Sequence, residues 1–348
     1  MYVIQLGPYP PPYGGVQANL VSIRERLRRT GIDSCVVNLT RHRQPEANGV
    51  FFPETALQTA VLLVRQQCRI LHLHIGGGVP IRVAALALFC TLIPGRRTVL
   101  TFHSGGYPAS PQGKAARRFS FRGLAFRRFD RVIVVNDQLR DVFLRYGVPL
   151  DRIRLIAPHA IDVNEMASQL PPRLAAFAAV HRPLLLSVGL LEPEYDIPSQ
   201  LALLGRLRER QMGAGLVIIG SGSLEPSLRE HIASLSYRDH VLLTGDMPHA
   251  DALRAIREAD VLLRTTRYDG DAVSVREALC LGTPVVATDN GMRPHGVTLV
   301  SVEDFDRFDA AVERVLADPA KRHMREGLTG EENLTAVLAL YRELAQPE

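Results

Sequence analysis

The sequence predicts an α/β fold made of two doubly wound parallel-sheet domains. Short apolar runs alternate with helical patterns along the whole chain of 348 residues, which is typical of parallel strands buried on both faces. The alternation occurs as two series, and the length suits about two domains. Between the series, residues 164–183 form a mixed stretch with a Pro-Pro pair, where we expect a linker and a short helix.

The first series opens with the strand "YVIQLG", followed by a loop and a helix from about Val16 to Arg29. Further strands are expected at "SCVVNL", "ILHLHIGG", "RTVLTFHSGG" and "RVIVVN", and the series ends near "IRLIAPHAID". Each strand ends in turn residues that lead into a helical stretch. We therefore predict a first domain at residues 1–163.

The second series predicts strands at "PLLLSVGLL", "GLVIIGSGS", "HVLLTGD", "ADVLLRTT", "TPVVATD" and "GVTLVS". These strands place a second domain at residues 164–330. The last helical pattern, about Glu331 to Leu344, follows a break that contains glycine. We expect residues 331–348 to pack back on the first domain.

The composition limits the class of protein. Hydrophobic residues make up 46% of the chain, enough for a sizeable core. Four cysteines without a CxxC pair indicate buried thiols in a reducing compartment. The opening strand does not resemble a signal peptide, and the apolar stretch Val83–Ile93 is too short to span a bilayer. We expect a cytoplasmic protein, at most peripheral to a membrane.

The net charge is +5, and only two of the 41 basic residues are lysines. This arginine bias has two explanations that composition does not separate. A GC-rich genome would produce it, and so would binding of phosphates or anionic surfaces, for which the guanidinium is the better hydrogen-bonding fork.

Ligands of doubly wound sheets bind outside the carboxyl ends of the strands. Turn-rich segments follow the predicted strands at those ends, namely Gly14–Gly15, Gly76–Gly78, Ser104–Gly106, Gly189, Gly220–Gly222, Gly245 and Asp269–Asp271. The last of these opens the stretch "YDGDAVSVREALCLGTPVVATD" at residues 268–289. It sets three carboxylates around a helix start, where acidic residues can simply stabilise the helix or can bind a ligand.

That stretch resembles the signature helix of the retaining GT-B glycosyltransferases of family four. In that family an acidic residue, seven other residues and a glutamate precede an Ala-Leu pair and a Gly-x-Pro-Val-Val run. Asp269 and Glu277 occupy the two acidic places. Other family segments are resembled, in the same order along nearly the whole chain, by "PPYGGVQ", "TVLTFHSGG", "LLLSVGLLEPE", "LVIIGSGSLEPSLREHI" and "VLLTGDMPHADALRAIREADVLL".

The resemblance implies two facing sheet domains and a nucleotide-sugar donor. It implies that the helix amides bind the diphosphate, that Glu277 accepts hydrogen bonds from ribose hydroxyls, and that Asp269 does so from the donor sugar. His103 would lie near the reacting centre, where its backbone carbonyl or its ring would stabilise an oxocarbenium-like state. His72 and His74 alternate along one strand, where packing is the better interpretation. The predicted donor-binding residues are Gly14, Gly15, Gly189, Gly220, Gly222, Arg264, Asp271, Ala272, Val273, Ser274 and Arg276.

The chain departs from the family pattern at the phosphate site. Family members usually carry an arginine after the glycine that matches Gly189 and a lysine five positions later, but here the residues are Leu190 and Tyr195. We predict that Arg264 supplies the missing charge, with Arg267 or Arg276 as second choices. The usual Phe-Gly pair after the first acid is Asp271-Ala272, the first acid is Asp and not Glu, and an interdomain Asn-Gly pair is His159-Ala160. These departures suggest a subgroup with its own sugar preference, and leave an inactive member as an alternative.

The segment Lys114–Arg131 holds seven basic residues and one acidic residue. As a helix it would gather Ala115, Phe119, Phe126 and Phe129 on one side. Two interpretations remain open: an ordinary helix with a solvated basic side, or a contact with an anionic membrane surface. No nucleic-acid recognition module is evident.

The function expected from the sequence is a bacterial retaining hexosyl- or N-acetylhexosaminyl-transferase. It would use a UDP-sugar, a glycan or lipid-linked acceptor and no metal or other cofactor, in cell-surface polysaccharide synthesis. Three alternatives remain: a metal-dependent GT-A enzyme that uses the Asp-x-Asp pattern of Asp269 and Asp271, a nucleotide-sugar epimerase or hydrolase, and a catalytically silent nucleotide-sugar-binding homologue.

Overall fold

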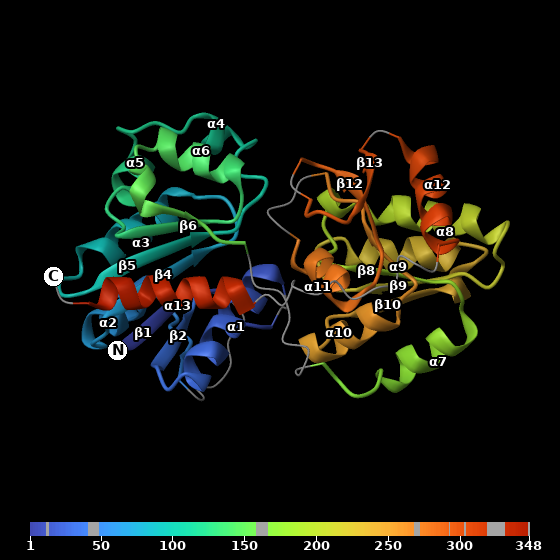
Figure 1. Ribbon diagram of the computed structural model, residues 1–348, viewed down its shortest axis with the longest axis horizontal. Helices are drawn as coiled ribbons and strands as arrows, with labels where there is room; N and C mark the ends of the chain where they lie inside the picture. Colours follow the sequence, from blue (N-terminus) through green and yellow to red (C-terminus); the bar gives the residue numbers. More distant parts are fainter. Residues whose placement is uncertain are drawn as a thin grey trace. The chain divides into compact units, whose positions relative to one another are not determined.

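A computed structural model gives the fold of the chain. It describes residues 1–11, 14–40, 49–157, 166–267, 272–291, 293–302, 304–318 and 331–346. The chain divides into two compact units. One contains Met1–His159 together with Glu331–Glu348, and the other contains Ala160–Gly330. Each is an α/β unit with helices on both faces of a parallel sheet (Figure 1).

The first unit has a seven-stranded sheet in the order β3-β2-β1-β4-β5-β6-β7, with every neighbouring pair parallel. Its strands are β1 Tyr2–Gly7, β2 Asp33–Asn38, β3 Val50–Phe51, β4 Ile70–Ile75, β5 Arg97–Phe102, β6 Arg131–Val134 and β7 Ile153–Leu155. Its helices are α1 Gly15–Arg29, α2 Ala56–Arg65, α3 Ile81–Leu92, α4 Pro111–Lys114, α5 Phe121–Phe126, α6 Asp137–Arg145 and α13 Glu331–Ala345.

The chain reverses its direction across this sheet between β1 and β4, and the helices after that point pack on the opposite face. Alternate strand residues supply the two cores. Leu71, Leu73 and Leu100 face α2, α3 and α5, whereas Val3 and Ile70 face α1 and α13. In Figure 1 the red α13 lies along the sheet of this unit, although about 170 residues of the second unit separate it in sequence.

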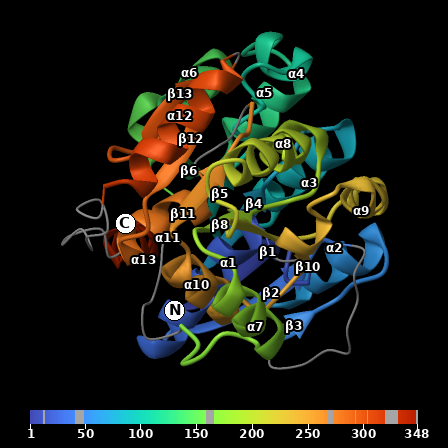
Figure 2. The same cartoon turned by 90° about the vertical axis from the view of Figure 1, so that its right-hand side faces the viewer.

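The second unit has a six-stranded parallel sheet in the order β10-β9-β8-β11-β12-β13. Its strands are β8 Leu184–Val188, β9 Gly215–Ile219, β10 Val241–Gly245, β11 Val261–Arg264, β12 Val285–Asp289 and β13 Thr298–Ser301. Its helices are α7 Pro172–Val180, α8 Ile197–Arg208, α9 Glu225–Ser234, α10 His249–Glu258, α11 Val273–Leu281 and α12 Phe305–Leu316. Figure 2 shows the helices of this unit from another side.

The two doubly wound sheets confirm the predicted fold class and exclude the single-sheet GT-A alternative. Two local predictions differ from the structure. The two-residue strand β3 was not predicted, because Val50–Phe51 is too short to show a pattern. The segment Lys114–Arg131 is not one helix: α4 ends at Lys114, α5 covers only Phe121–Phe126, and Arg131 begins β6.

The reason for the second difference is local capping. Ser110 and Ser120 each accept a hydrogen bond from the amide nitrogen three residues later, which starts two short helices where we expected one. As a result Phe126 and Phe129 are buried, while the Phe119 side chain is 91% exposed. None of the described helices is both long and apolar enough to cross a membrane.

Candidate active site

The reversal point of the second sheet lies between β8 and β11, and the predicted phosphate site is built there. The carbonyl oxygen of Val188, at the end of β8, accepts a hydrogen bond from Nη1 of Arg264 at 2.8 Å. It also accepts one from Oγ of Ser274 at 3.3 Å. The end of β8, the end of β11 and the first turn of α11 therefore meet at one atom.

Arg264 is almost fully buried, and its guanidinium lies 4.6 Å from the centre of the Tyr195 ring. A Cβ atom on Gly189 would come within 2.3 Å of that ring and within 2.8 Å of Nη1 of Arg264. Gly189 is therefore needed for close packing of the loop over Arg264 and Tyr195. Arg267 is exposed, and its backbone amide donates to the carbonyl oxygen of Glu194.

The turn around Tyr195 is fixed by hydrogen bonds of Thr265. Oγ1 of Thr265 donates to the carbonyl oxygen of Tyr195 at 2.6 Å and accepts a hydrogen bond from Nε2 of Gln200 at 2.8 Å. Both Thr265 and Gln200 are buried. The position of Tyr195 over Arg264 is therefore set by buried hydrogen bonds and not by the ring contact alone.

Helix α11 begins at this reversal point. Its N-cap residue Ala272 has no side-chain oxygen, and no side chain of the described residues caps the first turn. The amide groups of the first turn, at Val273 and Ser274, are those that a helix offers to anions. The helix ends at Gly282, which adopts a left-handed conformation with φ 80°.

Glu277 lies inside α11 and is buried. Its Oε1 accepts a hydrogen bond from Nε2 of His249, the first residue of α10, at 2.7 Å. Sequence reasoning missed His249. The signal was weak: a histidine after the "GDMP" turn that follows a strand, which predicts an edge position but no partner.

Backbone hydrogen bonds join the loops after β8 and β9. The amide of Gly189 donates to the carbonyl oxygen of Ile219, and the amide of Leu191 donates to that of Ser221. A Cβ atom on Gly220, which has φ 135°, would lie 1.9 Å from the Gly189 carbonyl oxygen. These contacts give Gly189, Gly220 and Gly222 a packing role in the loops that border the site, beside any contact with a donor.

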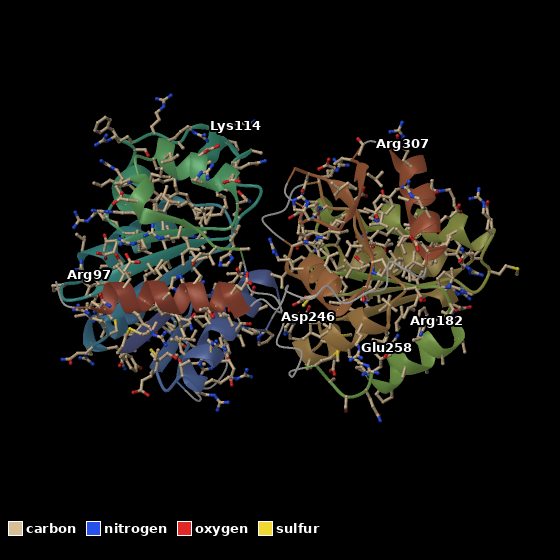
Figure 3. All side chains as sticks on the ribbon, in the orientation of Figure 1. Arg97, Lys114, Arg182, Asp246, Glu258 and Arg307 are labelled. Atoms are coloured by element: carbon tan, nitrogen blue, oxygen red, sulfur yellow. The ribbon has the colours of Figure 1, made fainter. Side chains whose placement is uncertain are left out.

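Side chains also join these loops to their neighbours. Oγ of Ser221 donates to Asp246 at 2.9 Å, and Figure 3 labels Asp246 just beyond the end of β10. The amide nitrogen and Oγ of Ser223 both donate to the carboxylate of Glu192. The carboxyl edge of the second sheet is therefore held in one conformation by several polar contacts.

The reversal point of the first sheet contains the predicted cleft histidine. The amide of His103 donates to the carbonyl oxygen of Ile75 at 2.8 Å, so His103 directly follows β5 beside the end of β4. Its Nε2 lies 3.5 Å from Nδ1 of His74, with the two rings stacked. Burial lowers the pKa of His103 to about 4, so its imidazole is neutral near pH 7.

The two other histidines of this group are buried inside the sheet layer. Nδ1 of His72 bonds to the Tyr341 hydroxyl of α13 at 2.5 Å, and its Nε2 to Oγ1 of Thr101 at 2.7 Å. Burial, and then the charge of His103, lowers the pKa of His72 to about 3. The pKa of His74 is also lowered, first by burial and then by its histidine neighbours.

The glycine loop of the first unit lies at the same reversal point. Gly14 is the N-cap residue of α1 and Gly15 its first residue, and no side-chain hydrogen bond caps the helix. A Cβ atom on Gly76, after β4, would lie 2.6 Å from Val16. A small cavity of about 10 Å³ is lined by His103, Asn19, Thr101 and Asn333 among others. It can hold about one water molecule, so it is not a substrate pocket.

The other predicted site residues fall in two groups. Ala272, Val273 and Arg276 lie in the first turn of α11 or beside it. Asp269, Asp271 and the pair His159-Ala160 lie outside the described residues, so their predicted roles stay predictions.

Two family models match the chain. Residues 13–165 match the model described as Glycosyltransferase Family 4, and residues 176–327 match Glycosyl transferases group 1. The second match includes the whole of α11.

Curated relatives match part of the chain. An alpha-D-kanosaminyltransferase of Streptomyces kanamyceticus is 27% identical over 57% of this chain and 54% of its own length. A GDP-mannose-dependent phosphatidylinositol monomannoside mannosyltransferase of Mycobacterium tuberculosis is 29% identical over 44% of this chain and 43% of its own length. The chain thus spans about half the length of these relatives.

Among solved structures, the HepE protein of Anabaena in complex with UDP-glucose superposes with a TM-score of 0.70. The superposition covers 99% of this chain and 98% of HepE at 16% identity. At that identity the likeness shows a shared fold, with two sheet domains along the full length of both chains.

Proposed function

This chain belongs to glycosyltransferase family four, and from that premise we propose that it transfers a sugar from a nucleotide-diphosphate sugar to a glycan or lipid-linked acceptor with retention of anomeric configuration. The donor is a UDP-linked hexose or N-acetylhexosamine, and the product contributes to a cell-surface polysaccharide. The reaction needs no metal ion.

One arrangement carries this proposal. The Arg264 guanidinium and the start of α11 meet at the Val188 carbonyl group, at the reversal point of the second sheet. A diphosphate needs positive charge and several N–H donors at one place, and a helix start beside an arginine offers both. Arg264 supplies part of the positive charge that the usual arginine and lysine provide. The positions of those two residues hold Leu190 and Tyr195 in this chain.

The hydroxyl groups of the donor need hydrogen-bond acceptors, and carboxylates of the chain provide them. Glu277 is oriented by His249, and this hydrogen bond fixes the carboxylate for the ribose hydroxyls. Asp269 accepts from the transferred sugar. Carboxylates directed at hydroxyls also keep their negative charge away from the diphosphate.

The neutral imidazole of His103 suits a place near the reacting carbon. A charged imidazolium would repel an oxocarbenium-like transition state, whereas a neutral ring and a backbone carbonyl oxygen can stabilise it. The low pKa of His103, caused by burial, keeps the ring uncharged in the pH range where such an enzyme works.

The UDP-glucose in the HepE complex supports a uridine donor for a chain of the same fold. The phosphatidylinositol mannoside substrate in the name of the mycobacterial relative supports a lipid-linked acceptor. The four cysteines are all free thiols, which fits the reducing cytoplasm. We therefore assign the reaction to the cytoplasmic face of the cell membrane.

A thermal-shift screen tests this function. UDP, GDP, ADP and their sugars are added to the full chain with and without EDTA, and the melting temperature of the second unit is followed. We expect UDP and a UDP-sugar to raise the melting temperature by the same amount with and without EDTA. A shift abolished by EDTA would instead favour a metal site at Asp269 and Asp271.

An activity assay with the donor so identified then separates the alternatives. Transfer to an acceptor, with the α-linkage of the donor retained in the product, supports the proposal. A free sugar or an epimerised donor formed without acceptor would favour a hydrolase or an epimerase. Donor binding without any turnover would favour a silent homologue.

A further inference from the structure

Helices α2, α3 and α5 form one layer over the first sheet, and each exposes large apolar side chains on its outer side. All three pack into the same core through their inner residues, such as Leu63 of α2 and Phe126 of α5. A surface helix normally presents polar residues on its outer side. These three helices expose large apolar side chains there beside a few polar ones such as Gln58, Arg65 and Arg82, and we name the apolar part of their outer surface the apolar face.

On α2 the outward residues are Leu57, Val61 and Val64, spaced at i, i+4 and i+7 so that they form one stripe. The Leu57 side chain is 73% exposed and Val64 is 57% exposed. The inward residues Thr59 and Leu63 lie on the opposite side of the helix and are buried.

Helix α3 repeats this pattern over a longer stretch. Ile81, Ala85 and Leu92 follow one another at i, i+4 and i+11 on its outer side, with Ile81 69% and Leu92 56% exposed. The only charged residue of the helix is Arg82, at its first turn. A helix that is apolar on all sides needs a covering partner.

Helix α5 continues the face with Phe121 and Leu124, which are both exposed, and the preceding Phe119 is almost fully exposed. Hydrogen bonds from the segments that follow α3 and α5 join the ends of these helices. Nη2 of Arg96 donates to the carbonyl oxygens of the last turn of α2, and Nε of Arg128 donates to Oγ1 of Thr91 in α3 at 3.3 Å. Exposed apolar side chains therefore occur on all three helices of this layer.

The charge around the apolar face is mainly positive, with the exposed Glu54 just before α2 as an exception. Residues 55–129 contain ten arginines and one lysine and no acidic residue. Lys114, Arg117 and Arg118 are exposed at one end, where Figure 3 labels Lys114 in α4. The guanidinium of Arg118 lies 5.8 Å from the centre of the exposed Phe119 ring. The net charge of the whole chain is only +5, so the basic charge is concentrated here.

We propose that the apolar face docks on the surface of an anionic phospholipid membrane. Exposed aliphatic and aromatic side chains enter the boundary between headgroups and acyl chains, while arginines and lysine contact lipid phosphates. The proposal rests on the proposed function only in its choice of partner, because a transferase for a lipid-linked acceptor works at such a surface. It replaces the single helix Lys114–Arg131 by a face built from three helices.

The same charge argues against other partners. Two copies of this chain joined through this face would bring two surfaces of the same sign together, which opposes association. A nucleic acid would match the arginines, but most of the exposed side chains are aliphatic and do not stack on bases.

Flotation of the full chain with lipid vesicles tests the proposal. Vesicles of phosphatidylcholine are compared with vesicles that also contain phosphatidylglycerol. We expect binding to the anionic vesicles, with weaker binding at high salt. In the double variant Ile81→Ser/Leu92→Ser we expect at least a roughly tenfold loss of binding, since two large apolar anchors are removed. Arg117→Glu/Arg118→Glu should lose binding to the anionic vesicles as well.

Matched controls come from the second unit. Val180 at the end of α7 is 71% exposed, and Arg173 in the same helix is also exposed. Val180→Ser and Arg173→Glu should float like the unchanged chain. The melting temperature of every variant is measured, because substitutions of exposed residues should leave folding intact.

Several results would overturn the proposal. They are failure of the unchanged chain to bind anionic vesicles, binding that the apolar-face variants do not alter, and a dimer that the same variants dissociate in light scattering. Binding of a single-stranded polynucleotide to the unchanged chain without vesicles, if lost in the arginine variant only, would point to nucleic acid. UDP binding is measured in parallel. Vesicle binding without UDP binding would contradict the proposed function alone, and UDP binding without vesicle binding would contradict docking alone.

Discussion

The guanidinium of Arg264 lies 4.6 Å from the centre of the Tyr195 ring and donates a hydrogen bond to the carbonyl oxygen of Val188. Tyr195 occupies the position where family members usually carry a phosphate-binding lysine. In this chain an aromatic ring at that position supports an arginine from the neighbouring strand. The charge is therefore kept at the reversal point of the sheet, although it comes from a different element.

If Arg264 binds the diphosphate, Arg264→Ala should raise the dissociation constant for UDP by about tenfold to a hundredfold, the usual effect of losing a charged hydrogen bond. Isothermal titration calorimetry measures it. Arg267→Ala, at an exposed position three residues after Arg264, is the matched control and should change the constant less than about twofold. Equal effects of the two substitutions would contradict the special role of Arg264.

Arg264→Ala also removes packing beneath Gly189, so its stability must be followed separately. Tyr195→Leu keeps the arginine and removes the ring that supports it. We expect a smaller loss of UDP affinity, because a cation–π contact contributes about 0.5–2 kcal/mol. UDP affinity unchanged in Tyr195→Leu would mean that the hydrogen bond to Val188 alone holds the guanidinium.

The second prediction concerns the buried pair Glu277 and His249. Glu277→Gln keeps the size of the side chain and removes its charge, and we expect it to weaken binding of UDP by about tenfold or more. His249→Gln should have a smaller effect of the same kind. The double variant should be no worse than Glu277→Gln alone, because His249 acts by orienting that carboxylate. Additive losses in UDP affinity would show that the two residues act independently.

How far the sequence predicted this site depends on the kind of interaction. The strands, the two units and the start of α11 were predictable, because buried parallel strands and a helix start leave patterns over several neighbouring residues. The pairing of Glu277 with His249 was not, since the two residues are 28 positions apart. A contact of this kind depends on how α10 and α11 pack on one sheet face, which no local pattern contains.

The segment Lys114–Arg131 illustrates the opposite error. The segment has helical periodicity, but the caps at Ser110 and Ser120 and the burial of Phe126 and Phe129 divide it into two short helices. Periodicity records which residues prefer burial, and it does not record where the backbone turns. The apolar face was missed for the same reason, because it joins residues of three helices that are each unremarkable in sequence.

The third prediction is a pH dependence of the first unit. The pKa values of His72 and His103 are lowered by burial to about 3 and about 4, and that of His74 is lowered too. The unfolded chain binds protons at these histidines below pH 6.5, whereas the folded unit does not until about pH 4. The free energy of unfolding should therefore fall as pH decreases from about 6.5 to about 4, by up to about 1.4 kcal/mol per pH unit for each histidine.

Hydrogen exchange of peptides from β4 and β5 at pH 7 and pH 5, corrected for intrinsic rates, measures this change. His74→Gln should reduce the difference between the two pH values, and His231→Gln, at an exposed position of α9, should leave it unchanged. A first unit whose stability is the same at both pH values would show that these histidines titrate normally.

The last prediction separates backbone strain from packing at two glycines. Gly220 and Gly245 both adopt positive φ, at 135° and 74°, and the amide of Gly220 donates to the carbonyl oxygen of Gly245. A Cβ atom on Gly245 would meet nothing within 4 Å, whereas one on Gly220 would lie 1.9 Å from the carbonyl oxygen of Gly189. Gly245→Ala should therefore cost only the strain of a left-handed residue, about 1–2 kcal/mol.

Gly220→Ala must in addition displace the loop that carries Gly189, which covers Arg264 and Tyr195. We expect a loss of stability clearly larger than that of Gly245→Ala, together with weaker UDP binding, measured by urea unfolding of the second unit and by calorimetry. Equal losses in the two variants would mean that the loops after β8 and β9 separate at little cost. In that case the close approach of the loops would not position Arg264, and the phosphate site would depend on α11 alone.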